Sequence, residues 1–353
     1  MKLPSHGPWM DTFGEHGDVV VSSRARLARN LTDFPFVNRA DEAQHAEILQ
    51  FVRSLPLCEQ SDWRWIELAD LDRRERRLLL ERHLVSQEFI ERDVPRAVGI
   101  GHADRLSVMV NEEDHLRMQA LVPGCDLAEA WRLVASVDGR LEQVADLAVH
   151  PRWGYLTACP TNVGTAVRFS VMAHLPALRL TNEVERLKRA AIALDVAVRG
   201  FYGEGSDSSG EFYQLSNQVT LGLSEVDLLE KFSTEIVPRI VAYERMAREM
   251  LLDRNRLGLE DRIHRALGLL RSARLLTTEE AMKNLSRLRL GTVVGLLDEV
   301  ELATIHRLFL AVQPAHLLQE HPDLVATAGS SERNGEDVRI RERRASIVRS
   351  ALA

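Results

Sequence analysis

The pattern of hydrophobic residues changes once along the 353-residue chain, near Ser224. Before Ser224, short β-branched or alternating runs such as residues 19–21 and 106–110 lie between amphipathic segments. After it, long helical patterns continue almost to the end of the chain. Strands and helices that are segregated in this way are typical of an α+β fold or of separate domains. We therefore predict an α+β domain over residues 1–225 and an all-helical domain over residues 226–353.

Residue spacing and turn signals predict the individual elements. Helices are expected at 41–55, 71–84, 126–149 and 182–194, with Asp126 as an N-cap and a break near Asp138-Gly139. Strands are expected at 63–68, 97–101, 106–110, 169–178, 197–203 and 212–219. In the helical region we expect interruptions at Pro238, Gly258, Gly291 and Pro314.

Charge, cysteine count and hydropathy exclude several classes of protein. The formal net charge is -7, which argues against a nucleic-acid or membrane-surface partner. The three cysteines are scattered and form neither a disulfide framework nor a zinc motif. The N-terminus lacks a signal-peptide pattern, and no apolar run has the length of a membrane span. We therefore expect a protein of the reducing cytoplasm.

Four short segments combine arginine with small, polar or acidic residues near the ends of expected strands. Several planar cationic donors suit a phosphoryl group, because charge develops over its equatorial oxygens during transfer. Only four of the 45 basic residues are lysine, for which genomic base composition is the ordinary explanation. A single arginine is usually a solvated surface charge, so the prediction of a phosphate site depends on five together. The segments are 22–26, 111–117, 159–168 and 199–204, and the arginines are Arg24, Arg26, Arg117, Arg168 and Arg199.

The common nucleotide-binding motifs are missing from the sequence. It contains no GxxxxGK(S/T) loop, which argues against a P-loop site. It also lacks the strand lysine, HRD and DFG set of the protein kinases. Bound ATP would therefore be held by side chains more than by a glycine-rich backbone.

Two glutamates and one cysteine suggest chemistry on a guanidinium group. Each of Glu113 and Glu204 could bind the fork of N–H donors of a guanidinium with both carboxylate oxygens. One of them would accept a proton as the guanidinium nitrogen attacks. Nearby arginines would favour the thiolate form of Cys159. Taken alone, the acidic run is more simply a surface turn, and the cysteine is more simply a small buried hydrophobe.

Three motifs, in this order, resemble the guanidino-kinase (phosphagen kinase) superfamily: NEEDHLR at 111–117, CPTNVGT at 159–165 and RGFYGE at 199–204. The chain is more similar to the bacterial protein-arginine kinases of that superfamily, the McsB family. Its SSRAR segment begins at Ser22, which leaves no room for the N-terminal helical domain of phosphagen kinases. Residues 202–206 and 216–218 match the protein-kinase branch, and an extra helical domain with the segments 289–291 and 313–317 follows. The resemblance covers the chain from about Val19.

The resemblance implies a fold and a set of roles. The fold would be a guanidino-kinase-like catalytic domain with a mainly antiparallel sheet flanked by helices. Glu113 and Glu204 would be the catalytic carboxylates, and Cys159 would face the substrate arginine. Mg²⁺ would be held by the ATP phosphates and water, without a metal site on the protein. ATP would be bound by Ser22, Ser23, Arg24, Ala25, Arg26, His83, Arg117, Arg168, Phe169, Ser170, Val171, Met172, Arg199, Gly200, Phe201, Tyr202 and Gly203.

The resemblance also implies partners. The substrates would be proteins with exposed arginines, since a guanidinium site without an N-terminal lid can stay open to a polypeptide. In the family the product marks proteins for a Clp-type protease, and an activator protein stimulates the kinase. A homodimer is a further expectation. The alternatives are a kinase of free arginine or another small guanidino compound, and a catalytically inactive adaptor that docks through its helical domain.

The end of the chain departs from the family pattern. Family members usually carry Arg-Asp-x-x-Arg-Ala there, a motif that binds phosphoarginine and tunes activity. Here residues 339–345 read RIRERRA. Arg344 and Ala345 match the motif, but Ile340 and Arg341 stand where arginine and aspartate are expected. This departure weakens the expectation of phosphoarginine sensing.

Overall fold

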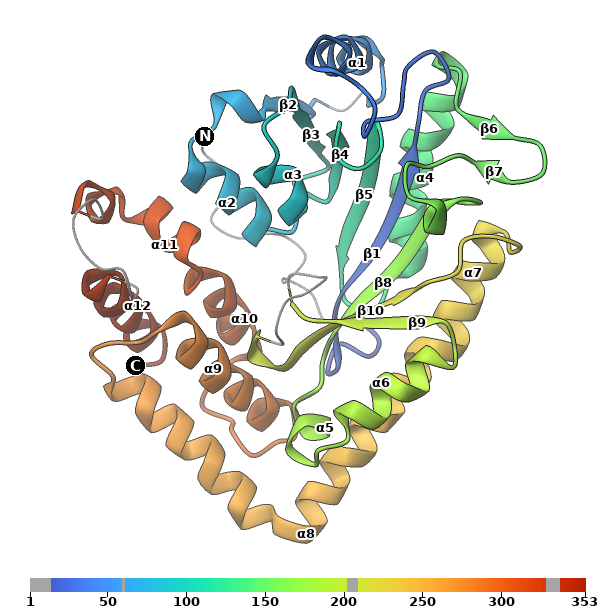
Figure 1. Cartoon of the computed structure of the whole chain (residues 1–353). Coiled ribbons are helices and arrows are strands. Elements are labelled where there is room, and N and C mark those ends of the chain that lie inside the picture. The colour runs from blue at the N-terminus through green and yellow to red at the C-terminus, as the bar shows by residue number, and fades with distance from the viewer. Residues whose placement is uncertain (1–13, 59–60, 202–208, 328–336) are drawn as a thin grey trace.

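The fold is built on one eight-stranded antiparallel sheet (Figure 1). A computed structural model describes residues 14–58, 61–201, 209–327 and 337–353. The strand order is β2-β3-β4-β5-β1-β8-β10-β9, and neighbouring strands are antiparallel throughout. This confirms the predicted α+β class with a mainly antiparallel sheet. The strands are β1 (Val20–Arg29), β2 (Arg64–Glu67), β3 (Ala97–Gly101), β4 (Leu106–Val110), β5 (Leu116–Pro123), β8 (Val167–His174), β9 (Val196–Arg199) and β10 (Phe212–Asn217), and a separate hairpin consists of β6 (Val149–His150) and β7 (Gly154–Tyr155).

Helices flank the sheet and build the C-terminal region (Figure 1). Capping side chains set several of their starts. Asp41 and Asp72 accept backbone N–H bonds three residues later at α1 and α2, and Asp126 caps α4 as predicted. No helix in the described ranges is long and apolar enough to cross a membrane. The helices are α1 (Glu42–Ser54), α2 (Arg73–Glu81), α3 (Gln87–Glu91), α4 (Leu127–Val144), α5 (Pro176–Leu180), α6 (Val184–Ile192), α7 (Glu225–Lys231), α8 (Val237–Ser272), α9 (Thr278–Val293), α10 (Leu302–Ala311), α11 (Pro314–Glu320) and α12 (Val338–Ala351).

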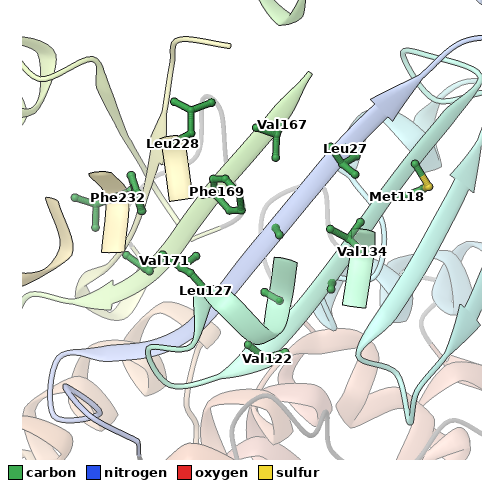
Figure 2. Close-up of a cluster of buried hydrophobic side chains, with 14 of the residues drawn as sticks. Leu27, Met118, Val122, Leu127, Val134, Val167, Phe169, Val171, Leu228 and Phe232 are labelled. Carbon is green, nitrogen blue, oxygen red and sulfur yellow. The ribbon is translucent and has the colours of Figure 1, made fainter. Parts of the chain in front are cut away.

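One face of the sheet carries the main hydrophobic core (Figure 2). Strand alternation turns Leu27 of β1, Met118 of β5 and Phe169 of β8 onto this face, and all three are fully buried. Leu127 and Val134 of α4 pack in the same cluster. We call this side of the sheet the core face.

The opposite face, which we call the site face, is divided between packing and polar groups. Toward the C-terminal helices, Met172 and Phe201 join a second core that contains Ile263 of α8 and Phe309 of α10. The rest of this face carries polar side chains. Helix α8 contributes to both cores, because its backbone leaves helical geometry at Asn255 (φ -156°, ψ 57°). The domain division at residue 225 stays a prediction.

Two predicted elements near the sheet have different limits in the structure. Helix α4 continues through Asp138 and Gly139, so the predicted break there is wrong. A helical glycine costs only about 1 kcal/mol relative to alanine, and the Asp138 carboxylate pairs with Arg29 at 2.6 Å. The strand predicted over 169–178 is also too long, because α5 begins at Pro176 after β8 has ended.

Two predicted interruptions of the C-terminal helices are wrong for local reasons. The break in α8 lies at Asn255 and not at Gly258, and the Asn255 side chain accepts the Gly258 N–H at 3.0 Å. Helix α9 continues through Gly291, which lies so close to Ile263 that a Cβ would come within 2.6 Å of it. By contrast, Pro238 and Pro314 lie in the first turns of α8 and α11, where proline is tolerated.

Candidate active site

A cavity of about 410 Å³ opens on the polar part of the site face. Side chains reach it from β1, β5, β8, β9 and β10, from α3, and from the segments after α2 and before β8. Arginines and glutamates predominate among its charged groups. The predicted site residues that line it are Ser22, Arg24, Arg26, His83, Glu113, Arg117, Cys159, Arg168, Ser170, Met172, Arg199 and Phe201. All four segments that the sequence singled out therefore contribute to one cavity.

Strand pairing fixes the order of these side chains along the cavity. Arg117 pairs with Ala28, Arg168 with Arg26, and Met172 with Ser22. A strand rises roughly 3.4 Å per residue, so the six steps from Ala28 to Ser22 cover about 20 Å. The cavity therefore runs from a Glu113 end, at the start of β5, to a Met172 end beside the C-terminal helices.

The arginines of the cavity repel one another. Burial, together with the positive charges of Arg117, Arg168 and Arg199, lowers the pKa of Arg24 to about 10. Burial and the neighbouring arginines also lower the pKa of Arg26 well below its usual value. An entering polyanion would relieve this repulsion, because opposite charge favours the cationic form of each side chain. The arrangement suits a phosphate chain.

A pair of glutamates closes one end of the cavity. Glu112 is buried, and its carboxylate accepts bonds from Arg117, from Ser86 Oγ and from the Glu113 backbone N–H. Burial opposes its ionisation, but Arg117 and Ser86 hold the pKa of Glu112 below its usual value. Glu113 is more accessible, with 38% of its side chain exposed, and accepts from Arg117 Nη2 at 3.1 Å and Asn162 Nδ2 at 3.4 Å. Glu112 therefore anchors the turn, and Glu113 faces the opening.

A hydrogen bond holds the loop that carries Cys159 against the turn formed by residues 112–114. Asp114 Oδ1 accepts from the Ala158 backbone N–H at 2.7 Å and from Asn30 Nδ2 at 2.6 Å. Cys159 itself is partly buried, and its Sγ lies 3.0 Å from Thr161 Oγ1. Two segments that lie 44 residues apart in the sequence are therefore held together by a direct hydrogen bond. The thiol and the Glu113 carboxylate line the same end of the cavity.

Uncharged groups predominate at the other end, although Arg199 pairs at the same level of the sheet as Met172. Leu121, Met172 and Phe201 contact the cavity and also belong to the core shared with the C-terminal helices. The His83 ring meets the Phe201 ring edge to face at 5.0 Å. Burial, with a smaller contribution from Arg24, lowers the pKa of His83 to about 3, so this imidazole is neutral at physiological pH. A flat, uncharged wall of this kind suits a planar base.

Five predicted ATP contacts do not line the cavity. Ser23, Ala25, Phe169 and Val171 alternate onto the core face, and Ser23 Oγ donates to the Gly124 carbonyl at 2.8 Å. Gly200 is also absent from the wall. These predictions treated consecutive strand residues as equivalent, whereas only every second side chain faces the site. Tyr202, Gly203 and Glu204 lie outside the described residues.

The structure adds groups that the sequence did not single out. Leu121 and Gln214 line the cavity, and so do residues of α3 and its flanks, including Glu88 and Arg92; Asn162, inside the predicted segment 159–168, also lines it but was given no role. Strand position could have indicated both Leu121 and Gln214. Leu121 lies four residues after Arg117 on β5 and so faces the same side, and Gln214 of β10 pairs with Met172 of β8. Nothing in the local sequence of α3 signals its place beside Glu113.

Comparison with known families and solved structures agrees with this geometry. Residues 50–247 match the family model of the ATP:guanido phosphotransferase C-terminal catalytic domain. Residues 256–353 match that of the protein-arginine kinase McsB C-terminal domain. The fold resembles the duplicated taurocyamine kinase of Schistosoma mansoni with bound transition-state analogue components (TM-score 0.59, 24% identity, 75% of this chain and 40% of that one). It also resembles lombricine kinase (TM-score 0.57, 20% identity, 69% and 70% of the two chains).

Curated relatives are similar over nearly the whole length. The protein-arginine kinase of Symbiobacterium thermophilum is 43% identical over 317 residues, which cover 88% of this chain and 90% of the relative. That of Halalkalibacterium halodurans is 40% identical over 349 residues, or 98% and 95% of the two chains. With both family models and these relatives in agreement, the chain belongs to the protein-arginine kinases, a phosphotransferase family within the guanidino kinases.

Proposed function

We propose that this protein transfers the γ-phosphoryl group of ATP to arginine side chains of other proteins. The observation that carries the proposal is the order of groups along one cavity. An uncharged wall suited to a base is followed by clustered arginines and then by Glu113 with Cys159. A nucleoside triphosphate and a guanidinium can bind along such an axis with the γ-phosphate facing the guanidinium.

The arginines would bind MgATP as the phosphoryl donor. Arg24, Arg26, Arg117, Arg168 and Arg199 supply charge at several levels of the sheet, which suits the α-, β- and γ-phosphates. In the described ranges no group of three metal-ligating side chains could hold an ion. The family resemblance implies that Mg²⁺ would be held by the phosphates and water of the bound nucleotide.

Glu113, Glu204 and Cys159 would act on the acceptor. A guanidinium nitrogen attacks the γ-phosphorus, a P–N bond forms, and the bond from that phosphorus to the β–γ bridging oxygen breaks to release ADP. The attacking nitrogen loses one proton, which a carboxylate accepts. Glu113 is accessible and faces the opening, so we assign it this role together with Glu204. Cys159 would polarise the guanidinium from the same end of the cavity.

A protein substrate is favoured by the exposure around Glu113. Thr161 on one side, and Glu88 and Arg92 on the other, are exposed in the described structure. An arginine on a polypeptide can therefore approach this end without the chain around it being buried. The curated relatives carry the same activity in their names.

The cellular role follows the family. We propose a two-domain cytoplasmic kinase, divided near residue 225, whose product marks proteins for a Clp-type protease and which an activator protein stimulates. A homodimer belongs to the same proposal. The support for these points is the family resemblance and the match of residues 256–353 to the McsB C-terminal model.

The decisive experiment compares two acceptors. The full chain is incubated with MgATP and either casein or free arginine, and the products are analysed by mass spectrometry under conditions that preserve acid-labile phosphoarginine. We expect phosphoarginine on casein and little phosphorylation of free arginine. Phosphorylation of free arginine alone would mean a small-guanidino kinase, and no transfer to either acceptor would favour the inactive adaptor.

A further inference from the structure

The buried carboxylate of Glu81 joins the catalytic sheet region to the C-terminal helices. Glu81 is the last residue of α2 and is fully buried. Its Oε1 and Oε2 accept the Ala315 backbone N–H at 3.0 and 3.1 Å. Its Oε2 also accepts the His316 backbone N–H at 3.1 Å and lies 3.0 Å from His316 Nδ1. One carboxylate thus receives the first backbone donors of α11 and one side-chain donor.

Apolar packing accompanies this charged contact. Ala315 is buried in a cluster with Leu78, Leu79 and Leu80 of α2. The start of α11 is in turn fixed to the C-terminal helices, because Gln313 Nε2 donates to the Phe309 carbonyl of α10 at 3.0 Å. Helix α11 therefore docks on α2 at a defined point.

The same part of α2 leads directly into the cavity. His83 follows Glu81 by two residues and has a left-handed backbone (φ 57°), a conformation that surrounding contacts must maintain. Its ring contacts Phe201, the Phe201 ring lies 5.4 Å from Phe212, and Phe212 lies 4.8 Å from Phe309. These contacts form a closed ring around the uncharged end of the cavity. The ring leads from Glu81 through His83, Phe201, Phe212 and Phe309 to α11, and α11 returns to Glu81 through its backbone N–H groups.

We propose that Glu81 is a positioning residue for the nucleotide, which holds the His83–Phe201 wall in place by docking α11 against α2. The inference rests on the proposed function only in taking the uncharged end as the base site. Glu81 touches neither substrate. Its effect should therefore fall mainly on nucleotide binding, because the ring of contacts that includes Glu81 closes around the uncharged end of the cavity.

The test is Glu81→Gln in the full chain. Glutamine has nearly the same shape, but one of its two terminal groups is a donor and would face the N–H donors of α11. Bonds to a charged acceptor are stronger than neutral ones, and we expect both KM for ATP and Kd for MgADP to rise about tenfold. KM for casein should change less than twofold. Glu67→Gln removes the same charge from an exposed pair with Arg53 and should leave all three constants within twofold.

The outcomes separate the two proposals. Titration calorimetry with MgADP measures the nucleotide site even if no acceptor is phosphorylated. A folded Glu81→Gln protein with nucleotide constants within twofold of wild type overturns the positioning role, as does an equal rise in KM for casein. If Glu81→Gln fails to fold, His316→Ala keeps both backbone bonds and should raise the two nucleotide constants about threefold; unchanged constants would again overturn it. If the wild-type protein binds no MgADP, both the proposed function and this inference are wrong.

Discussion

The same strands build both faces of the central sheet, but the core face stabilises the fold and the site face lines the cavity. On β8, Phe169 and Val171 enter the apolar core, while Arg168 and Ser170, which alternate with them along the strand, line the cavity. The core face gains stability from burial, at about 25 cal/mol per Å² of apolar surface. The site face concentrates cations that repel one another and lower the pKa of Arg24. Stability and ligand binding are thus assigned to alternate residues of each strand.

The sheet and its core hold the unfavourable charge arrangement of the site in place. Arg24, Arg26, Arg117 and Arg168 project from strands that pair on both sides, with the core beneath, whereas Arg199 projects from the edge strand β9. Strands β1, β5 and β8 therefore cannot move apart to relieve the repulsion. A bound polyanion would recover the energy of that repulsion.

The largest expected effect is on the site face. Glu113→Gln should lower kcat by about 10³- to 10⁴-fold, because glutamine cannot accept the proton of the attacking guanidinium. The free energy of unfolding should change little, since Glu113 is partly exposed. Initial rates of phosphoarginine formation and urea unfolding measure both, with Glu249→Gln on the exposed side of α8 as the control. An undiminished rate would remove Glu113 from the mechanism.

The matching change on the core face should do the reverse. Phe169→Ala leaves a cavity in the core and should lower the free energy of unfolding by about 3–5 kcal/mol. Its neighbours Arg168 and Ser170 keep their places, so the KM for ATP of the folded fraction should stay close to the wild-type value. Urea denaturation and steady-state kinetics at low temperature test this. A large rise in KM at full folding would show that the two faces are not independent.

A third variant separates binding from stability on the site face itself. Arg24→Met removes one cation from the cluster, so we expect the empty protein to gain about 1–3 kcal/mol in free energy of unfolding, given the lowered pKa of Arg24. The same variant should bind MgADP far more weakly. Thermal unfolding with and without MgADP shows both effects. Loss of stability in the protein without MgADP would contradict repulsion among the arginines.

The smallest effect concerns pH. The pKa of His83 is about 3 in the folded protein and about 6.5 in the unfolded chain, so only the unfolded chain takes up a proton as pH falls below 6.5. Protonation of His83 in the unfolded chain should therefore lower the free energy of unfolding as the pH falls from 6.5 to 3. Between pH 7.5 and 5.0 wild type should lose about 1–2 kcal/mol more than His83→Gln. Urea unfolding at the two pH values measures the difference, and equal losses would mean that His83 is not held neutral.

The sequence predicted the fold class, most of the predicted site residues line one cavity, and those that do not line it have a common cause. Motif residues such as Arg24, Glu113 and Cys159 are identified by type and spacing, and they do line one cavity. Which side of a strand a residue faces depends on pairing partners far along the chain, so Ser23 and Phe169 were assigned to ATP although both lie on the core face. The central strand β5 received no prediction, because its first residues belong to the charged segment 111–117.

Contacts between distant elements could not be predicted at all. The bond between Asp114 and Ala158 and the docking of Glu81 on α11 join residues 44 and more than 230 positions apart. No local pattern signals such pairs. The residues of α3 reach the cavity for the same reason, because β-sheet topology and not their own spacing brings them there.

The most direct test is a crystal structure of the full chain with MgADP and an arginine-containing peptide. We expect the base against His83 and Phe201, the phosphates among the five arginines, and the peptide guanidinium at Glu113 beside Cys159. A nucleotide bound in the opposite direction, or a peptide arginine bound away from Glu113, would contradict it.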